Sequence, residues 1–181
     1  MEFQDVIKSR TSIRSYDNTK NIEKEKLEYV LECARLAPSW ANTQCWRFLV
    51  IQNPETIQEL AKTSIINRWL KTAPMMIVAC ADPGESGTHN QIEYYTVDVA
   101  IAMEHLILAA TDVGLGSCWI AGFDEEKVKE ILSLPKRIKV VALTPLGYPS
   151  VKTGVEAKIA KTITRGTKRK SLTEIIRYEK W

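Results

Sequence analysis

The stretch from Val97 to Val113 is the most apolar part of this 181-residue chain, and it limits the folds that the chain can adopt. Four ionisable side chains interrupt it, at Asp98, Glu104, His105 and Asp112. A membrane span would place these groups in hydrocarbon at a high cost, so the stretch is predicted to be a buried helix running from about Gln91 to Asp112. Because this helix is apolar on most faces, part of it is expected to lie in a subunit interface.

The composition favours one globular domain with its own core. Hydrophobic residues make up 45% of the chain, and a net charge of +3 does not give the strong positive field of a nucleic-acid-binding protein. The four cysteines form no C-x-x-C pair, which argues against zinc and iron–sulfur sites and fits a reducing, cytoplasmic location. The N-terminus lacks the charged-then-apolar order of a signal peptide, so secretion is not expected.

Apolar periodicity predicts further helices and strands around the central helix. Helices are predicted over 3–9, 23–37, 54–62 and 124–132. Strands are predicted over 47–52, 74–80 and 138–145, a loop over 82–88, and a simple helix stop over 114–117. Helices come in groups between the strands and do not alternate strictly with them, which favours an α+β fold over a doubly wound sheet.

A basic segment near the N-terminus has the residue types of a phosphate site. Arg10, Ser12 and Arg14 alternate along an extended segment, so two guanidinium groups and a hydroxyl can face the same way. Arginine matches phosphate oxygens through its planar fork of donors, and the basic cluster 168–170 could close the site from elsewhere in the fold. Ordinary surface charge is the alternative for each residue taken singly.

The amide-rich segment 38–44 complements this phosphate site. Asn42 and Gln44 carry donors and acceptors that suit the pyrimidine edge of a flavin, so the combination indicates a flavin mononucleotide (FMN) site. A helix-capping loop is the alternative for the segment by itself. His89 and His105 lie in poor contexts for nucleophilic catalysis, which fits an enzyme whose cofactor carries the reaction.

As a whole, the chain resembles the FMN-dependent nitroreductase family. The similar stretches lie between Val6 and Trp181 in the order expected for the family, and their order makes the resemblance specific. They are R-T-S-I-R-S-Y, L-A-P-S-W-A-N-T-Q-C-W-R-F, A-P-M-M-I-V-A-C-A, D-V-A-I-A-M-E-H-L-I-L-A-A, G-L-G-S-C-W-I-A-G-F-D, L-G-Y-P and R-K-S-L-T-E-I-I.

The resemblance implies a central, mostly antiparallel sheet flanked by helices, in an intertwined homodimer with two FMN sites at the subunit interface. C-terminal segments exchange between subunits in this family. Residues 1–181 are therefore expected to form a single FMN-binding domain, in which 150–181 is an extension that docks on the partner subunit.

The resemblance also implies the residues that hold the cofactor, with no side chain acting as general acid or base and no metal. Those expected near the phosphate and ribityl chain are Arg10, Thr11, Ser12, Arg14, Lys168 and Arg169. Those brought to the flavin from the other subunit are Pro38, Ser39, Trp40 and Asn42. Asn67 is expected to contact the ring or ribityl chain, and Ile120, Ala121 and Gly122 to lie beside the reactive ring nitrogen, where a backbone N–H can donate to it.

The chain departs from the family's usual pattern in three places. Cys45 stands where the family usually has proline, which loosens a turn and adds a thiol near the predicted flavin edge. Ala121 stands where some nitroreductases have glutamate, so no role of that carboxylate transfers. The excursion between Asp82 and Gln91 is compact, which implies that a helical insertion over the substrate is absent and that the acceptor site is exposed and permissive.

The predicted function is that of an FMN-dependent oxidoreductase. Hydride would pass from NADH or NADPH to the flavin, and then to nitroaromatic or quinone-type acceptors, by a ping-pong mechanism in one site. Related flavin chemistry, such as reductive dehalogenation of iodotyrosine-type substrates or destruction of the protein's own flavin, is one alternative. A non-catalytic flavin-binding protein is the other.

Overall fold

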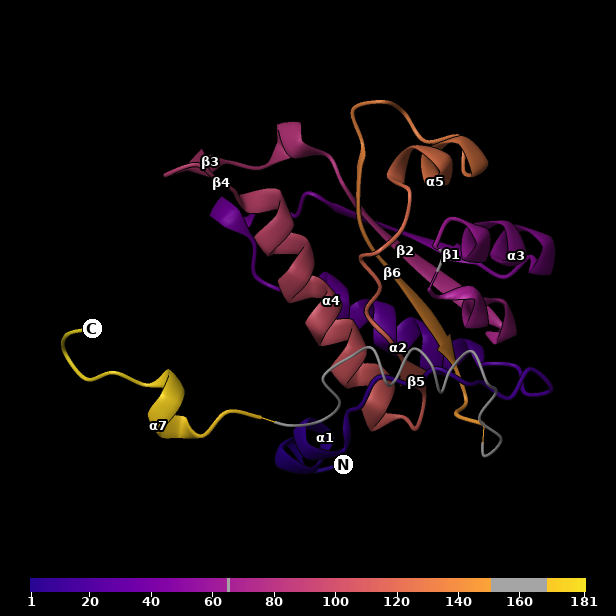
Figure 1. Ribbon diagram of the computed structural model, residues 1–181, viewed down its shortest axis with the longest axis horizontal. Helices are drawn as coiled ribbons and strands as arrows, with labels where there is room; N and C mark the ends of the chain where they lie inside the picture. Colours follow the sequence, from indigo (N-terminus) through magenta and orange to yellow (C-terminus); the bar gives the residue numbers. More distant parts are fainter. Residues whose placement is uncertain (65, 151–168) are drawn as a thin grey trace.

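The computed structural model describes residues 1–64, 66–150 and 169–181. Within these residues, an antiparallel sheet in the order β1-β2-β6-β5 forms the centre of the molecule (Figure 1). The strands are β1 (Trp46–Ile51), β2 (Met75–Ala81), β6 (Lys139–Gly147) and the short β5 (Gly116–Ser117). The three longer strands and the antiparallel α+β class confirm the predictions. β5 is a correction, because its residues were expected only to end a helix.

Every residue of β2 is buried, because helices cover both faces of the sheet. Val78 pairs with Leu49 of β1 and Leu143 of β6. Alternate side chains enter two different cores: Met75, Ile77, Ala79 and Ala81 on one face, and Met76, Val78 and Cys80 on the other. A strand buried on both sides has no polar positions, which explains why this segment is a continuous apolar run in the sequence.

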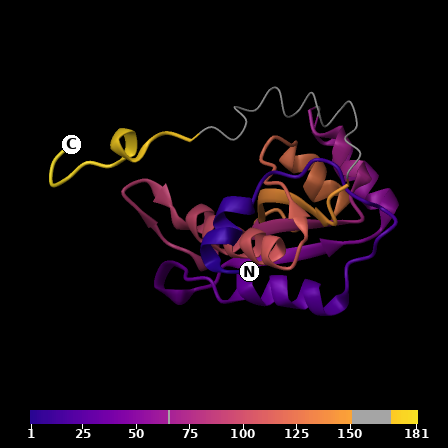
Figure 2. The same ribbon diagram turned by 90° about the horizontal axis from the view of Figure 1, so that it is seen from below.

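The helices α2 (Lys24–Arg35) and α4 (Tyr94–Asp112) build the first core. Val99, Met103 and Leu106 of α4 are fully buried, so the prediction of a buried central helix is confirmed. Figure 2 shows α2 on one side of the sheet and α5 on the other. α5 (Glu125–Ile131), α3 (Pro54–Lys62) and the 3-10 helix η2 (Arg68–Thr72) build the second core.

Helix α1 (Phe3–Ser9) lies near the C-terminal end of α4. The amino group of Met1 pairs with Asp112 at 2.5 Å, and Asp112 is the last residue of α4. The chain then runs in extended form from α1 to the sheet edge, where Ser12 forms a parallel bridge with Ser117 of β5. The predicted extended segment is thereby placed beside the sheet.

A small hairpin lies at the opposite end of α4 (Figure 1). It contains β3 (Thr88–His89) and β4 (Ile92–Glu93) and follows the 3-10 helix η3 (Pro83–Glu85). Asn90 and Gln91 form its turn with positive φ angles of 50° and 64°. This corrects the predicted loop over 82–88 and explains why α4 begins at Tyr94 and not at Gln91. The compact excursion that the sequence implied is therefore a short hairpin.

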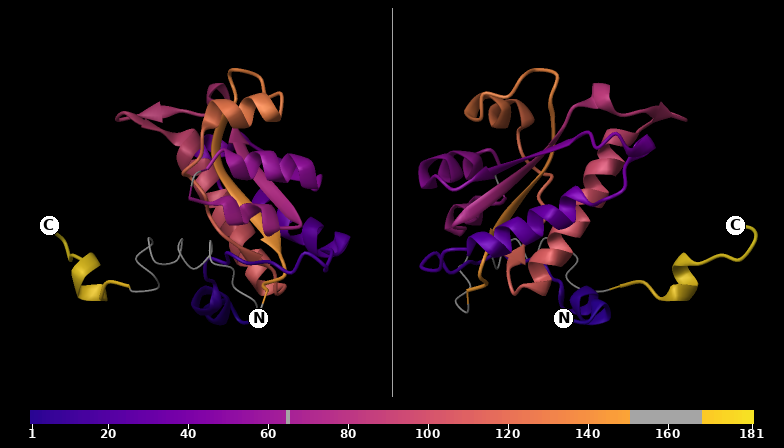
Figure 3. Two further views of the ribbon diagram at one scale, coloured as in Figure 1. Left: turned by 45° about the vertical axis from the view of Figure 1, so that its right-hand side comes forward. Right: turned by 180° about the vertical axis from the view of Figure 1, so that it is seen from behind.

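The C-terminal helix α7 (Leu172–Ile175) stands away from the rest of the chain in both views of Figure 3. All residues from Arg169 to Trp181 are exposed, and they include apolar side chains. Residues 151–168 lie outside the described residues, so the docking of 150–181 on a partner subunit stays a prediction. No helix in the described part of the chain has both the length and the apolar character to cross a bilayer.

Candidate functional site

The basic segment is fixed to the edge of the sheet by backbone contacts. The Ile13 N–H donates to the Ser117 carbonyl at 2.9 Å, and the Tyr16 hydroxyl donates to the Ile13 carbonyl at 2.7 Å. Gly116 permits this close approach, because a Cβ built there would lie 2.8 Å from the Ile13 side chain. The alternating residues Arg10 and Arg14 are half-buried on this anchored segment.

The Cys118 thiol lies just beyond β5, beside the segment that carries Arg10, Ser12 and Arg14. Burial raises the pKa of the Cys118 thiol, whereas the charges of Arg14 and Arg10 and a hydrogen bond with Ser12 act in the opposite direction. Burial also raises the pKa of Tyr16, and the charge of Arg14 again opposes it. The two guanidinium groups and the hydroxyl of this segment form a donor set that suits a phosphate dianion.

A second group of predicted residues lies next to this cluster. Tyr16 stacks on Trp69 of η2, with ring centroids 6.4 Å apart and an interplanar angle of 20°. Asn67 directly precedes η2, and its side-chain amide donates to Ser64 at 2.9 Å. The carbonyl of the neighbouring Thr63 accepts from the Asp124 N–H at 3.0 Å, so the Asn67 segment lies beside the 120–124 segment.

The strip 120–122 leaves the sheet after Ile120, and its last two residues are exposed. Ile120 and Leu143 exchange two backbone hydrogen bonds of 2.9 Å, which fix the start of the strip. Ala121 and Gly122 are exposed, and a Cβ built on Gly122 would meet nothing within 4 Å. In the described residues, neither the Ala121 nor the Gly122 N–H donates to another protein group. These two N–H groups are available to a ligand beside Asn67.

The segment 38–44 has a strained backbone. Ala41, Asn42 and Gln44 have positive φ angles of 44°, 58° and 55°. Asparagine tolerates this region, whereas alanine and glutamine there cost roughly 1–3 kcal/mol each. The Ser39 hydroxyl accepts from the Gln44 N–H at 2.9 Å and closes the loop. Such strain is typical of ligand-binding loops, and here it holds the exposed amides of Asn42 and Gln44 close together.

Trp40 and the hairpin hold this segment against the N-terminal end of α4. The rings of Trp40 and Tyr94 lie 4.4 Å apart between centroids. Gly87 packs so tightly on the indole that a Cβ there would lie 2.5 Å from it. The backbone N–H of Trp40 donates to the carboxylate of the buried Asp98 at 2.7 Å. Sequence reasoning gave Asp98 no role, because its partners are far away in the sequence.

The Cys45 thiol is fully buried and faces the protein interior. Its sulfur lies 3.5 Å from an Asp98 carboxylate oxygen. Burial, followed by the hydrogen bond to Asp98, raises the pKa of Cys45 to about 11. The thiol is therefore protonated at neutral pH and serves as a hydrogen-bond donor. Within the described residues, no group of three or more His, Cys, Asp or Glu side chains could hold a metal ion.

Within one chain, the predicted residues fall into separate places. Arg10, Ser12 and Arg14 lie on the segment beside β5, with the exposed Thr11 among them, whereas Asn67 lies near the strip 120–122. The segment 38–44 contacts Asp98, whereas the α1 end of α4 lies at Asp112. These contacts are 14 positions apart, which is about 21 Å of helix at 1.5 Å per residue. One chain therefore does not bring the segment 38–44 to the arginine cluster.

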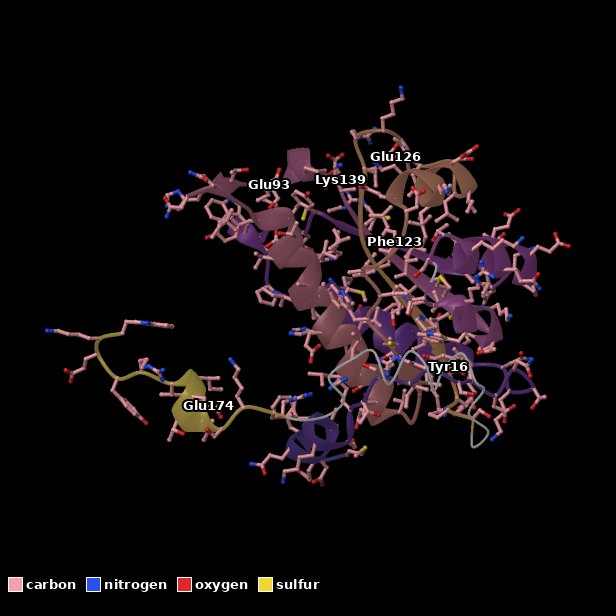
Figure 4. The ribbon with its side chains drawn as sticks, in the orientation of Figure 1. Tyr16, Glu93, Phe123, Glu126, Lys139 and Glu174 are labelled. Atoms are coloured by element: carbon pink, nitrogen blue, oxygen red, sulfur yellow. The ribbon has the colours of Figure 1, made fainter. Side chains whose placement is uncertain are left out.

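The structure describes one of the two C-terminal basic residues predicted at the phosphate, Arg169. Arg169 is exposed at the start of the segment that carries Glu174, and Figure 4 shows Glu174 far from Tyr16 and Phe123 on the body. Glu93, at the end of the hairpin, lies on the opposite side of the body from Tyr16 in the same view. Lys168, the other predicted phosphate contact, lies outside the described residues.

Comparison with known proteins shows a consistent pattern of similarity. Residues 7–66 and 62–148 match the model of the nitroreductase family. An NADH dehydrogenase of Thermus thermophilus is 30% identical over 172 residues, which cover 78% of this chain and 83% of the relative.

Solved structures extend the similarity to the fold. A nitroreductase family protein from Clostridium novyi NT is 42% identical with a TM-score of 0.81, and the match covers 83% of this chain and 87% of that one. An FMN-dependent nitroreductase from Clostridium difficile R20291 is 27% identical with a TM-score of 0.73, and the match covers 91% of this chain and 98% of that one.

Proposed function

We propose that this chain, which belongs to the nitroreductase family, is an NAD(P)H-dependent oxidoreductase that binds FMN at the arginine cluster and the strip 120–122. Family membership makes the chain a nitroreductase-type oxidoreductase, and the names of its relatives point to a nicotinamide co-substrate. The observation that carries the FMN assignment is the bridge of Ser12 to Ser117, which places the segment with Arg10 and Arg14 at the sheet edge three residues before the strip 120–122.

The donor set suits both ends of FMN. Arg10 and Arg14 would pair with the phosphate dianion, and the Ser12 hydroxyl would donate to a phosphate oxygen. Asn67 lies beside the strip and would contact the ribityl chain or the ring. The Ala121 and Gly122 N–H groups donate to no described protein group and would serve a ring nitrogen. The residues present therefore fit the cofactor at both ends.

Bound FMN would supply the chemistry that these side chains lack, which is to accept hydride from a nicotinamide and pass it on. The protein groups would bind and orient: cationic side chains hold the phosphate, and backbone N–H groups hold the ring edge. Because the excursion 82–93 is only a short hairpin, the same open face can admit the nicotinamide and then the acceptor. This supports a ping-pong order with nitroaromatic or quinone-type acceptors.

We also propose that the complete site needs two copies of the chain. The segment 38–44 lies about 21 Å along α4 from the α1 end, so a second copy would have to bring its own segment to the flavin. A groove on α4, lined by Val97, Ile101 and Leu108 among others, presents an apolar face for such contact. Leu172 and Ile175 expose apolar side chains that would dock on the partner.

Free thiols support the proposed cytoplasmic location. All four cysteines are unpaired, as expected in a reducing compartment.

Anaerobic mixing tests the proposal directly. The protein is saturated with FMN, freed of excess flavin, and mixed with NADH or NADPH while the flavin absorbance is followed. We expect bleaching with at least one nucleotide and recovery of the absorbance when a nitroaromatic or a quinone is added. Flavin that stays oxidised would indicate a non-catalytic carrier, whereas recovery only with an iodotyrosine would indicate a dehalogenase. Failure to retain any FMN would overturn the assignment.

A further inference from the structure

Asp98 is an acidic side chain in the interior of the molecule. It is 1% exposed, in the second turn of α4. Burying an acidic group is costly unless its oxygens accept hydrogen bonds from groups that compensate for the lost water. The partners of Asp98 therefore indicate what the buried carboxylate does.

Three groups from two segments of the chain donate to this one carboxylate. The backbone N–H of Trp40 donates to Oδ1 at 2.7 Å, and the Ser86 hydroxyl donates to Oδ2 at 2.8 Å. The Cys45 thiol lies 3.5 Å from Oδ2 as a third donor. Asp98 thus joins both ends of the segment 40–45 to the base of the hairpin.

All three donors are neutral groups. Among the described residues, no lysine or arginine forms an ion pair with Asp98. The groups that donate to it are a backbone amide, a hydroxyl and a thiol. Hydrogen bonds of this kind depend on geometry more than a contact between two mobile charges does, so they suit a positioning role.

We propose that Asp98 is the positioning residue of the segment 38–44, and that its carboxylate holds the amides of Asn42 and Gln44 ready to meet the flavin. The inference rests on the proposed function, because it takes that segment as part of the flavin site. Asp98 itself faces the interior and is not expected to contact the flavin.

The backbone of the segment needs such a support. Ala41, Asn42 and Gln44 all have positive φ angles, which a short exposed segment does not keep by itself. Its internal hydrogen bonds, such as that from the Gln44 N–H to the Ser39 hydroxyl, close the loop but do not attach it to the body. The bonds to Asp98 make that attachment immediately before and after the strained residues.

The hairpin is attached through the same carboxylate. Ser86 bonds to Asp98, and the next residue, Gly87, packs directly on the Trp40 indole. Tyr94 covers another part of that ring. A change at Asp98 is therefore expected to loosen the hairpin and the amide-rich segment together.

The test compares Asp98→Asn with Val99→Ala in the full-length protein. The amide of D98N keeps an acceptor for Trp40 but directs N–H donors at Ser86 or Cys45. Val99 is fully buried in the core at the next position of α4, so V99A loosens the same helix without touching the segment. Amide hydrogen exchange of residues 40–45 and 86–94 is measured without flavin, and FMN affinity is measured by quenching of flavin fluorescence.

We expect exchange in both segments to rise by about tenfold in D98N, and FMN affinity to fall by about tenfold. V99A should leave the exchange rates and the FMN affinity within about twofold of the wild type, even if it lowers the thermal midpoint as much as D98N does. Unchanged exchange in D98N, or equal changes in V99A, would overturn the positioning role.

Two further variants keep the proposal testable if D98N does not fold. Ser86→Ala and Cys45→Ala each remove one donor and should raise exchange in the same segments by smaller factors. Unchanged exchange of these segments in both variants would contradict the proposal. If exchange rises as expected but the wild type binds no FMN, then Asp98 positions the segment and the proposed function is what fails.

Discussion

The Ile13 N–H donates to the Ser117 carbonyl at 2.9 Å, and this contact joins the N-terminal segment to the edge of the sheet. It places the segment that carries Arg10 and Arg14 beside β5, three residues before the strip 120–122 begins. Residues more than a hundred positions apart in the sequence thereby form one face. The first predictions concern this face.

Removing either arginine should weaken FMN binding. Arg10→Ala and Arg14→Ala each delete a charged donor, and we expect a loss of ~1.5–3 kcal/mol per variant, or roughly tenfold to a hundredfold in Kd. Titration followed by flavin fluorescence measures the change. Arg35→Ala removes an exposed guanidinium whose partner is Glu32 on the same helix, and it should leave the affinity unchanged. Wild-type affinity in both site variants would contradict the phosphate assignment.

A methyl group at Gly116 should separate the N-terminal segment from the sheet. The new Cβ would lie 2.8 Å from Ile13, so Gly116→Ala is expected to cost ~1–3 kcal/mol of unfolding free energy. Urea denaturation measures this cost. Gly122→Ala serves as the stability control, because a Cβ there meets nothing within 4 Å. Equal stability of the two variants would show that the contact at Gly116 relaxes without cost.

Native thiol reactivity should separate the cysteines. Burial is the main cause that raises the pKa of Cys45 to about 11 and of Cys80 to about 12, and it also raises the pKa of Cys118. Cys33 is half-buried and more accessible. We expect iodoacetamide at neutral pH to modify Cys33 first, and all four only after denaturation. Peptide mass spectrometry would contradict this if Cys45 were alkylated as fast as Cys33.

Acid should weaken the attachment of α5 to β6 through Glu125. Burial by itself would raise the pKa of Glu125, but a hydrogen bond from the Val140 N–H at 3.0 Å and the ion pair with Lys129 leave that pKa below 4.5. The stabilisation is therefore present above about pH 4.5 and is lost as the pH falls through the folded-state pKa.

Glu125→Gln should flatten the decrease in unfolding free energy between about pH 6 and pH 3, because the group that titrates is gone. Urea denaturation at several pH values gives the slope. Glu126→Gln is the matched control, since its side chain is 82% exposed and does not bond to β6. A slope in E125Q that equals the wild-type slope would argue against this linkage.

Local sequence signals predicted most elements because the interactions that define them are local. Asn53 accepts from the Thr56 N–H at 2.9 Å and Asp124 from the Lys127 N–H at 3.2 Å, so the predicted starts of two helices are confirmed at atomic detail. β5 and the β3–β4 hairpin were missed. Each of their strands spans two residues, too few for a periodic pattern, and the hairpin turn uses Asn90 and Gln91 without the glycine that usually marks it.

The sequence by itself determined the α+β class, the buried central helix and the residue types of a phosphate and flavin site, since each depends on short-range pattern and side-chain chemistry. Only the tertiary structure decided which of those residues meet. It brought the segment with Arg10 and Arg14 to the sheet edge that leads into the strip 120–122, and it left the segment 38–44 at the other end of α4. It also assigned Asp98 its partners at 40, 45 and 86. Such contacts join segments far apart along the chain, and packing of the two cores against the sheet fixes them.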